Sequence, residues 1–452
     1  MRIDPRDVQD IVALSPMQQS ILLECLLNPM EGLYIEQTEL IFQGPWSQQA
    51  AERSWKHLSA VNDSLRTIFR WEGLSEPVQI VFKERTVPAE YYSMTSLPAE
   101  DRERRSKKLM EEAAGKLDLG LCPIRLTFIP EAGRFRLVIT HHHILFDGWS
   151  NALLASEFVA AYTEALGDRT QARPVKTPYK QFINYLQSVQ TVEQEEVWKS
   201  YLKGFVQPPC KVSQSAGTTQ DSSLEVYASG LDSRLEEAAR LCAERGTTMS
   251  SLFQLAWGLT LQKFCGSDDV VFGTVVSGRN VPVQGIGEMV GLFMNTIPIR
   301  VRTHPGERLA SAWERLDQSN RECVPSHHLP LHAIKQAVDK TNEPLFDTFL
   351  AVENYPVNWS GLTGTDKLRL ESYRHRLNGT RFPLTVEILM INGFEIRFVY
   401  DGKYYSNNQV KVLDQEFCCI LYAAASMIHA PVEHLLYGAP AKACAPVADF
   451  DF

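Results

Sequence analysis

Several common sequence features are missing from this chain. No apolar run approaches the roughly 18 residues that suggest a membrane-spanning helix, and the opening MRIDPRDVQDIVALSP lacks the basic-then-apolar pattern of a secretory signal. Nine cysteines are scattered without a CxxC pair, which argues against a disulfide framework or a zinc site. We therefore expect buried thiols, a cytoplasmic location and no contact with a membrane.

An excess of basic residues is also missing. The 45 Lys and Arg residues are outnumbered by 54 Asp and Glu residues, and the formal net charge is −9. Because binding to a phosphate backbone calls for a basic surface, nucleic acid is not an expected partner. A chain of 452 residues that is 44% hydrophobic can bury large cores, and its length predicts about two to four domains.

One polar stretch is typical of a linker between two parts of the chain. The segment GDRTQARPVKTP, residues 167–178, contains two prolines and shows no periodicity. We predict an N-terminal lobe at 1–174, a C-terminal lobe at 175–438 and a Pro/Ala-rich tail at 439–452.

Hydrophobic periodicity predicts a mixture of helices and strands in both parts. Helices are predicted at 48–61, 98–117, 150–166 and 248–264, and strands at 33–44, 76–82, 133–140, 223–231 and 268–279. Two apolar runs on either side of Asn392-Gly393 predict a hairpin, since this pair adopts a type I′ turn without strain. The expected fold class is α/β, with two lobes that each layer helices on a sheet.

The stretch RLVITHHHILFDGWSNALLASEF, residues 136–158, carries the strongest chemical signal. A strand pattern runs into three histidines, and because side chains alternate along a strand, His141 and His143 face one way and His142 the other. Three bulky apolar residues follow, so the segment is expected to be buried. A single histidine at a strand end is usually structural. Burying an imidazole without hydrogen-bond partners is costly, so three buried histidines in a row favour a functional role for at least one of them.

The sequence around these histidines excludes several kinds of site. Adjacent strand histidines diverge and no HExxH accompanies them, so no metal site is predicted. There is no GxSxG nucleophile elbow. GIGEMVG, residues 285–291, has the spacing GxGxxxG and leads into a strand-like segment, so it is not a dinucleotide site. What remains is a histidine acting as a general base or a positioning group in an acyl transfer.

The motifs of this chain resemble those of a known family. HHILFDG fits the HHxxxDG signature of condensation domains of nonribosomal peptide synthetases. Six further blocks resemble the family's remaining motifs and follow one another in this order: LSPMQQSILL, NDSLRTIFRW, YKQFINYL, GTVVSGRNVPVQGIGEMVGLFMNTIPIRV, HHLPLHAIKQ and PLFDTFLAVENYP. Because the blocks span essentially the whole chain in the family's order, the chain is identified from its sequence as resembling a single condensation domain.

The resemblance implies a fold, a reaction and partners. The fold would be two lobes similar to chloramphenicol acetyltransferase, forming a V-shaped pseudo-dimer around a central tunnel. The reaction would be peptide-bond formation between a donor aminoacyl or peptidyl thioester and the α-amine of an acceptor aminoacyl thioester. Upstream and downstream carrier proteins would hold both substrates on 4′-phosphopantetheine, next to an adenylation domain in an antibiotic or siderophore synthetase. The domain itself would bind no cofactor.

The resemblance also implies roles for individual residues. His143, the second motif histidine, would be the general base or positioning residue, and His142 would be structural; His141 lies outside the motif and would pack. Asp147 would form a structural pair with Arg279. Backbone N–H groups of Gly148 and Trp149 would face the oxyanion, and Ser150 would cap the helix or touch substrate. Asn295 is a tunnel candidate; like Ser15, Gln18 and Arg66, it is expected mostly to hold the lobes together.

Related activities remain open. An epimerisation domain shares the histidine motif but needs an acidic partner across the tunnel, and no clear acidic signature is present. A stand-alone acyltransferase of the same fold and a non-catalytic recruitment platform remain open as well. His142 and His143 exclude a heterocyclisation domain, which would carry aspartate there. SPMQ, YIEQ, WEGLSEPVQ and HHILFDGWS most resemble the subgroup that accepts donors ending in a D-residue, with L-donor and dual types as alternatives.

Overall fold

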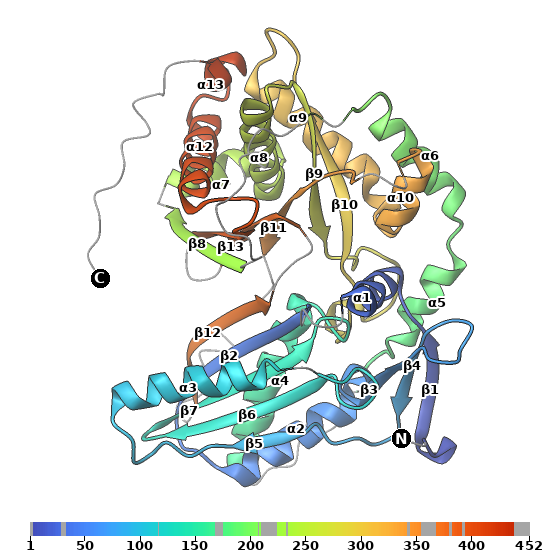
Figure 1. Ribbon diagram of the computed structural model, residues 1–452, viewed down its shortest axis with the longest axis vertical. Coiled ribbons are helices and arrows are strands. Elements are labelled where there is room, and N and C mark those ends of the chain that lie inside the picture. The colour runs from blue at the N-terminus through green and yellow to red at the C-terminus, as the bar shows by residue number, and fades with distance from the viewer. Residues whose placement is uncertain are drawn as a thin grey trace. The chain divides into compact units, whose positions relative to one another are not determined.

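The computed structural model describes residues 3–28, 33–115, 117–167, 175–206, 208, 224–231, 234–340, 344–353, 368–378, 382–390 and 394–437. It divides into two compact units (Figure 1). The first contains residues 1–189, 277–294 and 355–380, and the second contains 190–276, 295–354 and 381–452. Two later stretches of chain thus pack with the first unit, whereas our predicted division was a single boundary after residue 174. That boundary and the predicted tail lie outside the described residues.

The first unit is built on a mixed five-stranded sheet with the order β12-β2-β7-β6-β5 and a smaller antiparallel sheet with the order β1-β4-β3. Its elements are β1 (Val8–Ala13), α1 (Pro16–Leu27), β2 (Ile35–Gln43), α2 (Gln48–Val61), β3 (Thr67–Arg70), β4 (Val78–Phe82), β5 (Ala89–Tyr91), α3 (Ala99–Ala113), β6 (Ile124–Glu131), β7 (Arg134–His142), α4 (Gly148–Leu166), α5 (Lys180–Ser188) and β12 (Arg369–Asn378).

Strand β2 lies between β7 and β12 in the five-stranded sheet (Figure 1). It is buried from Ile35 to Phe42, so its charged residues are interior groups. On one face, Leu40 and Phe42 lie opposite Leu137 and Phe135 of β7 and join the core formed with α2 and α4. Because side chains alternate, Glu36 shares this face and lies opposite His141.

The second unit is built on a mixed six-stranded sheet with the order β10-β9-β11-β13-β14-β8. Its elements are α6 (Thr191–Leu202), β8 (Leu224–Leu231), α7 (Arg234–Arg245), α8 (Met249–Cys265), β9 (Asp269–Val276), β10 (Asn295–Arg302), α9 (Leu309–Cys323), α10 (Leu331–Ala337), β11 (Thr348–Glu353), β13 (Leu384–Leu389), β14 (Phe394–Asp401), α12 (Asn407–Ser426) and α13 (Glu433–Tyr437). Helix α8 is buried along most of its length, as its apolar sequence predicts.

Several predicted elements are present with shifted ends. The helix predicted at 98–117 is α3, and the helix predicted at 150–166 is α4, which begins two residues earlier. Strands β13 and β14 form the predicted antiparallel pair, whereas the Asn392-Gly393 turn lies outside the described residues. The α/β class is thereby confirmed.

The cysteine prediction is correct in part. Cys25, Cys122, Cys242, Cys265, Cys323 and Cys418 are free thiols. Cys419 is disulfide-bonded, contrary to the expectation of thiols only. That expectation rested on the absence of a CxxC pair, but a disulfide needs only two Cβ atoms brought close by the fold.

Candidate active site

The three histidines occupy the end of β7 and the turn before α4. His141 lies in the interior face of the sheet, where its Nε2 is 2.8 Å from Oε2 of Glu36 and its ring stacks on Phe146 with centroids 4.0 Å apart. His142 points to the opposite face, where its Nε2 is 3.4 Å from Sγ of Cys25 on α1. All three imidazoles are buried, so each is placed by specific neighbours.

His143 has one ring edge occupied by protein acceptors. Its Nδ1 lies 3.2 Å from the carbonyl oxygen of Phe146 and 3.0 Å from Oε1 of Glu36. A carbonyl oxygen can only accept a hydrogen bond, so Nδ1 carries the proton and Nε2 carries the free lone pair. Within the described residues Nε2 has no hydrogen-bond partner. Such a tautomer can accept a proton at Nε2 or hold an amine there.

His142 has the opposite tautomer. The backbone N–H of Ile144 donates to Nδ1 at 3.2 Å, so the proton sits on Nε2 and faces Cys25. Burial, with the neighbouring His143 and His141, lowers the pKa of His142 to about 3. Burial also raises the pKa of the Cys25 thiol to about 11. Both groups are therefore neutral near pH 7, and this pair is a packed polar contact.

Glu36 contacts three imidazoles at once. Besides His141 and His143, Nε2 of His375 on β12 lies 3.8 Å from Oε1 of Glu36. Burial by itself raises the pKa of Glu36, but His143, His375 and His141 outweigh it and hold the pKa well below its ordinary value. Burial lowers the pKa of His141 despite the opposing effect of Glu36. The cluster therefore contains an ionised carboxylate and a neutral His141.

Asp147 begins helix α4 and also fixes the loop at 277–294. As the N-cap residue it accepts the backbone N–H of Ser150 at Oδ1, 2.9 Å away. Oδ1 also lies 3.2 Å from Nη2 of Arg279, and Oδ2 accepts the N–H of Phe293 at 3.1 Å. The structure thus brings Asp147 and Arg279 together, and it directs the carboxylate away from the His143 imidazole and toward this loop.

Ser150 is not the cap of α4, the role that the sequence favoured for it. Its hydroxyl donates to the carbonyl of Gly291 at 2.9 Å, and it accepts the N–H of Gly291 and Nη2 of Arg279 at 3.1 and 3.0 Å. The cap is Asp147, because its extended backbone places the carboxylate over the first turn. Ser150 is fully buried and holds the 277–294 loop to α4.

Gly148 and Trp149 occupy the first two positions of α4. Their N–H groups precede the first intrahelical bond, which Asn151 donates to Asp147, and within the described residues they have no acceptor. The Trp149 indole donates to the carbonyl of Gly287 at 3.1 Å, and Arg279 lies over its ring at 5.2 Å. The Trp149 side chain therefore packs on the loop, while its backbone N–H remains available.

Other motif residues hold their own unit together. Asn295 begins β10 in the second unit, where its Nδ2 donates to the carbonyls of His327 and Leu329 at 2.7 and 2.8 Å. In the first unit, Ser15 and Gln18 form the capping box of α1. Gln18 also donates to the carbonyl of Ile144 at 2.9 Å, which fixes the turn after the histidines. The hydrogen bonds of Arg66 also lie inside the first unit.

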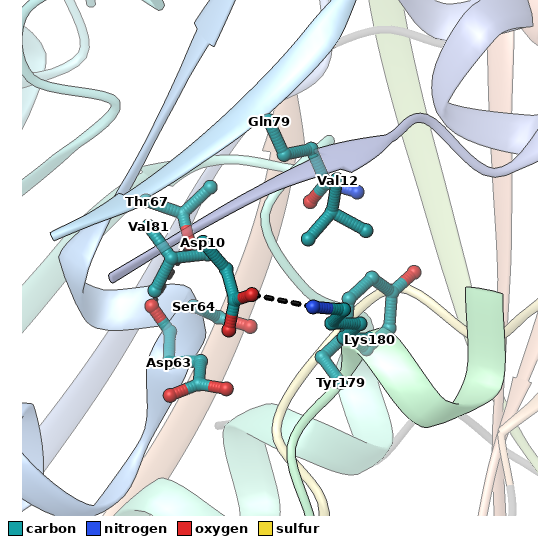
Figure 2. A pocket seen from close by; sticks show the side chains of 9 residues that line it. All are labelled: Asp10, Val12, Asp63, Ser64, Thr67, Gln79, Val81, Tyr179 and Lys180. Carbon is teal, nitrogen blue, oxygen red and sulfur yellow. Dashed lines mark hydrogen bonds and ion pairs between the residues drawn. The ribbon is translucent and has the colours of Figure 1, made fainter. Parts of the chain in front are cut away.

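Two pockets in the described part of the chain are lined by residues other than the three histidines. Figure 2 shows a small pocket between β1, β4 and α5, where Lys180 pairs with Asp10. Its 10 Å³ suffices for about one water molecule. A pocket of 320 Å³ in the second unit is lined by residues of both charge signs, including Lys203 and Asp339. Within the described ranges, no group of three or more His, Cys, Asp or Glu residues is arranged to hold a metal ion.

Sequence reasoning missed Glu36 and His375. Glu36 is the one acidic residue on the core-facing side of a strand whose other residues on that side are apolar or uncharged. That pattern could have identified it from the sequence. His375 has no such signal, since its position depends on the pairing of β12 with β2 across more than 300 residues of chain. The register places His375 opposite Thr38, one position along the same face from Glu36.

The amino-acid sequence matches the model of a known family. The model of the condensation domain matches residues 8–443. The chain belongs to the condensation-domain family. It is 26% identical over 420 residues to tyrocidine synthase 2 of Brevibacillus parabrevis, and 31% identical over 382 residues to surfactin synthase subunit 2 of Bacillus subtilis. These matches cover 90% and 81% of the chain but only 12% and 10% of those relatives.

Solved condensation domains have the same fold. The first condensation domain of the calcium-dependent antibiotic synthetase matches 94% of this condensation domain, and 98% of its own chain, with a TM-score of 0.78 at 17% identity. The starter condensation domain of rhizomide synthetase matches 94%, and 96% of its own chain, with a TM-score of 0.79 at 19% identity. These matches confirm the predicted chloramphenicol acetyltransferase-like fold. Within the described residues, no helix is long and apolar enough to cross a bilayer.

Proposed function

We propose that this condensation domain forms a peptide bond between two thioesters carried on phosphopantetheine, and that His143 serves the attacking amine. The observation that carries the proposal is the fixed orientation of His143. The Phe146 carbonyl holds Nδ1 at 3.2 Å, so Nε2 presents its lone pair. An upstream carrier protein would present the donor, and a downstream one the acceptor.

The chemistry requires one proton to move from the amine to the leaving sulfur. An α-amine has a pKa near 7.7–8.0, so roughly a tenth is free at pH 7. As the C–N bond forms, Nε2 of His143 would take the amine proton and return it to the thiolate as the C–S bond breaks. Such a base contributes about 10²–10⁴-fold, and holding the two thioesters together contributes as much or more.

The start of α4 supports the same proposal. The unpartnered N–H groups of Gly148 and Trp149 lie five and six residues after His143, at the positive end of the helix dipole. Backbone donors of this kind stabilise a tetrahedral oxyanion when they are held rigidly. Asp147 would position this helix start through its contacts with Arg279 and the Phe293 N–H, and would not itself carry a proton.

The relatives are large synthetases of which this chain spans a small part, so a neighbouring adenylation domain belongs to the proposal. Their multidomain character favours condensation over a stand-alone acyltransferase. The proposal also keeps a D-residue donor and a cytoplasmic location.

The test is an amide-forming assay with both carrier proteins loaded, using D- and L-phenylalanyl thioesters as donors and a panel of aminoacyl acceptors. We expect His143→Ala to fold normally and to lose about 10²–10⁴-fold in turnover. His304→Ala, which removes an exposed histidine, is the matched control and keeps full turnover. Near-normal turnover in folded His143→Ala would overturn the role of His143. Exchange of the donor α-proton without amide formation would indicate epimerisation.

A further inference from the structure

The carboxylate of Glu36 is the one acidic group that contacts His143 in the described residues. It lies on β2, between β7 and β12, and is 3% exposed. A buried carboxylate is costly unless charges or donors surround it. Here it is surrounded by imidazoles, in contrast to Glu39 on the opposite face of β2, which pairs with Arg136 and Arg374. A purely structural carboxylate is more stable beside a permanent cation, as Glu39 is.

The three imidazoles around Glu36 are not equivalent. His141 is fully buried and neutral, because burial lowers its pKa. His375 is the most exposed of the three, with 18% of its side chain accessible, and lies farthest from the carboxylate at 3.8 Å. His143 is nearer, with Nδ1 at 3.0 Å from Oε1. Because His141 is enclosed and neutral, His143 is the imidazole at the site of proton transfer that the charge of Glu36 reaches, and it lies closer to the carboxylate than His375 does.

We propose that Glu36 is a positioning residue for His143: its carboxylate keeps the proton on Nδ1 and stabilises the positive charge that develops when Nε2 accepts a proton. This inference rests on the proposed function of His143. The proton from the amine goes to Nε2 and then to the leaving sulfur, and Glu36 keeps its charge throughout. A carboxylate has the same effect on a histidine in hydrolase triads, where it fixes the tautomer and stabilises the imidazolium.

The other titratable groups near Glu36 and His143 are not placed to position His143. His142 faces the opposite side of the sheet and is neutral, and Cys25 beside it is a protonated thiol. Asp147 directs its oxygens to Arg279, Ser150 and Phe293. His375 lies near the same oxygen, Oε1, but at 3.8 Å it is farther from it than His143 is.

The nearly isosteric change Glu36→Gln removes the charge and keeps the shape. We expect kcat at the pH optimum to fall by about ten- to a hundredfold, within the range of a general base, with KM little changed. Without the charge, the imidazolium that forms when Nε2 accepts the amine proton is less stable. The acid limb of the pH–kcat profile should therefore move to lower pH. Glu36→Asp keeps the charge and should restore the wild-type acid limb.

The matched control is Glu39→Gln, which removes a buried carboxylate from the same strand but on the opposite face. We expect it to lower the melting temperature and leave the acid limb where it is. A Glu36→Gln protein with the wild-type kcat and acid limb would overturn the inference while His143→Ala remained inactive. Should His143→Ala stay active, the proposed function fails instead.

A second measurement uses the wild-type protein, so it does not depend on the stability of a variant. Nitrogen-15 chemical shifts of labelled histidine identify which ring nitrogen carries the proton, and His143→Ala assigns the signal. The inference expects Nδ1 of His143 to be protonated near pH 7. A proton on Nε2 would overturn it.

Discussion

Arg279 reaches Asp147 with Nη2 3.2 Å from Oδ1, and both side chains are more than nine-tenths buried. The same guanidinium donates through Nη1 to the carbonyls of Ile286 and Met289. Burial lowers the pKa of Arg279, and Asp147 opposes that effect. One ion pair therefore ties the start of α4 to a loop from more than 100 residues later in the chain.

We predict that Asp147→Ala destabilises the first unit by about 3–5 kcal/mol, because it leaves the guanidinium buried without its partner. The variant also loses the cap of α4 and the acceptor for the Phe293 N–H. Urea unfolding measures the change. Asp101→Ala removes a carboxylate from an exposed pair with Arg104 and should change stability by less than about 1 kcal/mol. An Asp147→Ala protein with unchanged stability but no activity would contradict the structural role.

Stability should fall when the pH drops below about 6.5, because the unfolded chain then protonates His142 while the folded state resists. The pKa of His142 is about 3 in the folded protein and about 6.5 in the unfolded chain. The free energy of unfolding is therefore highest above pH 6.5, and it decreases as the pH falls from about 6.5 toward 3. The slope from this one group is at most about 1.4 kcal/mol per pH unit.

Urea unfolding between pH 7 and pH 4 would measure this slope in the wild type and in His142→Gln. We expect a shallower slope in the variant. The slope should not vanish, since burial also lowers the pKa of His141 and, in the second unit, lowers that of His327 to about 4. His304→Gln, at an exposed site, should keep the wild-type slope. Equal slopes in wild type and His142→Gln would show that His142 is accessible to protons in the fold.

Gly278 precedes Arg279 with a φ of 65°, and a Cβ there would lie 1.8 Å from the carbonyl oxygen of Phe293. We predict that Gly278→Ala costs at least about 3 kcal/mol, through both left-handed strain and the displaced backbone. Gly133→Ala tests strain alone, because its φ is 73° and no atom lies within 4 Å of the added Cβ. It should cost about 1 kcal/mol in thermal or urea unfolding. Equal losses of stability in the two variants would show that the backbone at Phe293 shifts to accommodate the added Cβ at little cost.

Asn151 is fully buried in α4, and neither its Nδ2 nor its Oδ1 has a hydrogen-bond partner in the described part of the chain. A buried amide without partners is destabilising, so Asn151→Leu should raise stability by about 1–2 kcal/mol. Asn62→Leu is the contrasting variant, because Asn62 is buried but bonded to Leu58, Glu157 and Lys176. Its stability should fall. A loss of stability in Asn151→Leu would indicate that a bound water or ligand uses the amide.

Local pattern predicted much of the fold but not the surroundings of the histidines. The alternating side chains before His141 and the apolar face after Ser150 each identify an element from a few neighbouring residues. The family motifs led to Arg279 as the partner of Asp147. Glu36 and His375 were missed because they meet through strand register, which periodicity within one strand does not encode. Asp147 and Ser150 were both plausible caps by residue type, and only the backbone at 147 decides between them.

The pairing of β2 with β12 has a consequence for how the chain is made. The first unit is completed by residues 277–294 and by β12, which ends at Asn378. During synthesis, β2 therefore keeps an unpaired edge, and Glu36 lacks His375, until most of the chain has left the ribosome. Long-range pairings of this kind form slowly and leave partly folded chains open to aggregation. A chain stopped before β12 would contain His141, His142 and His143 and still present an open sheet edge to its neighbours.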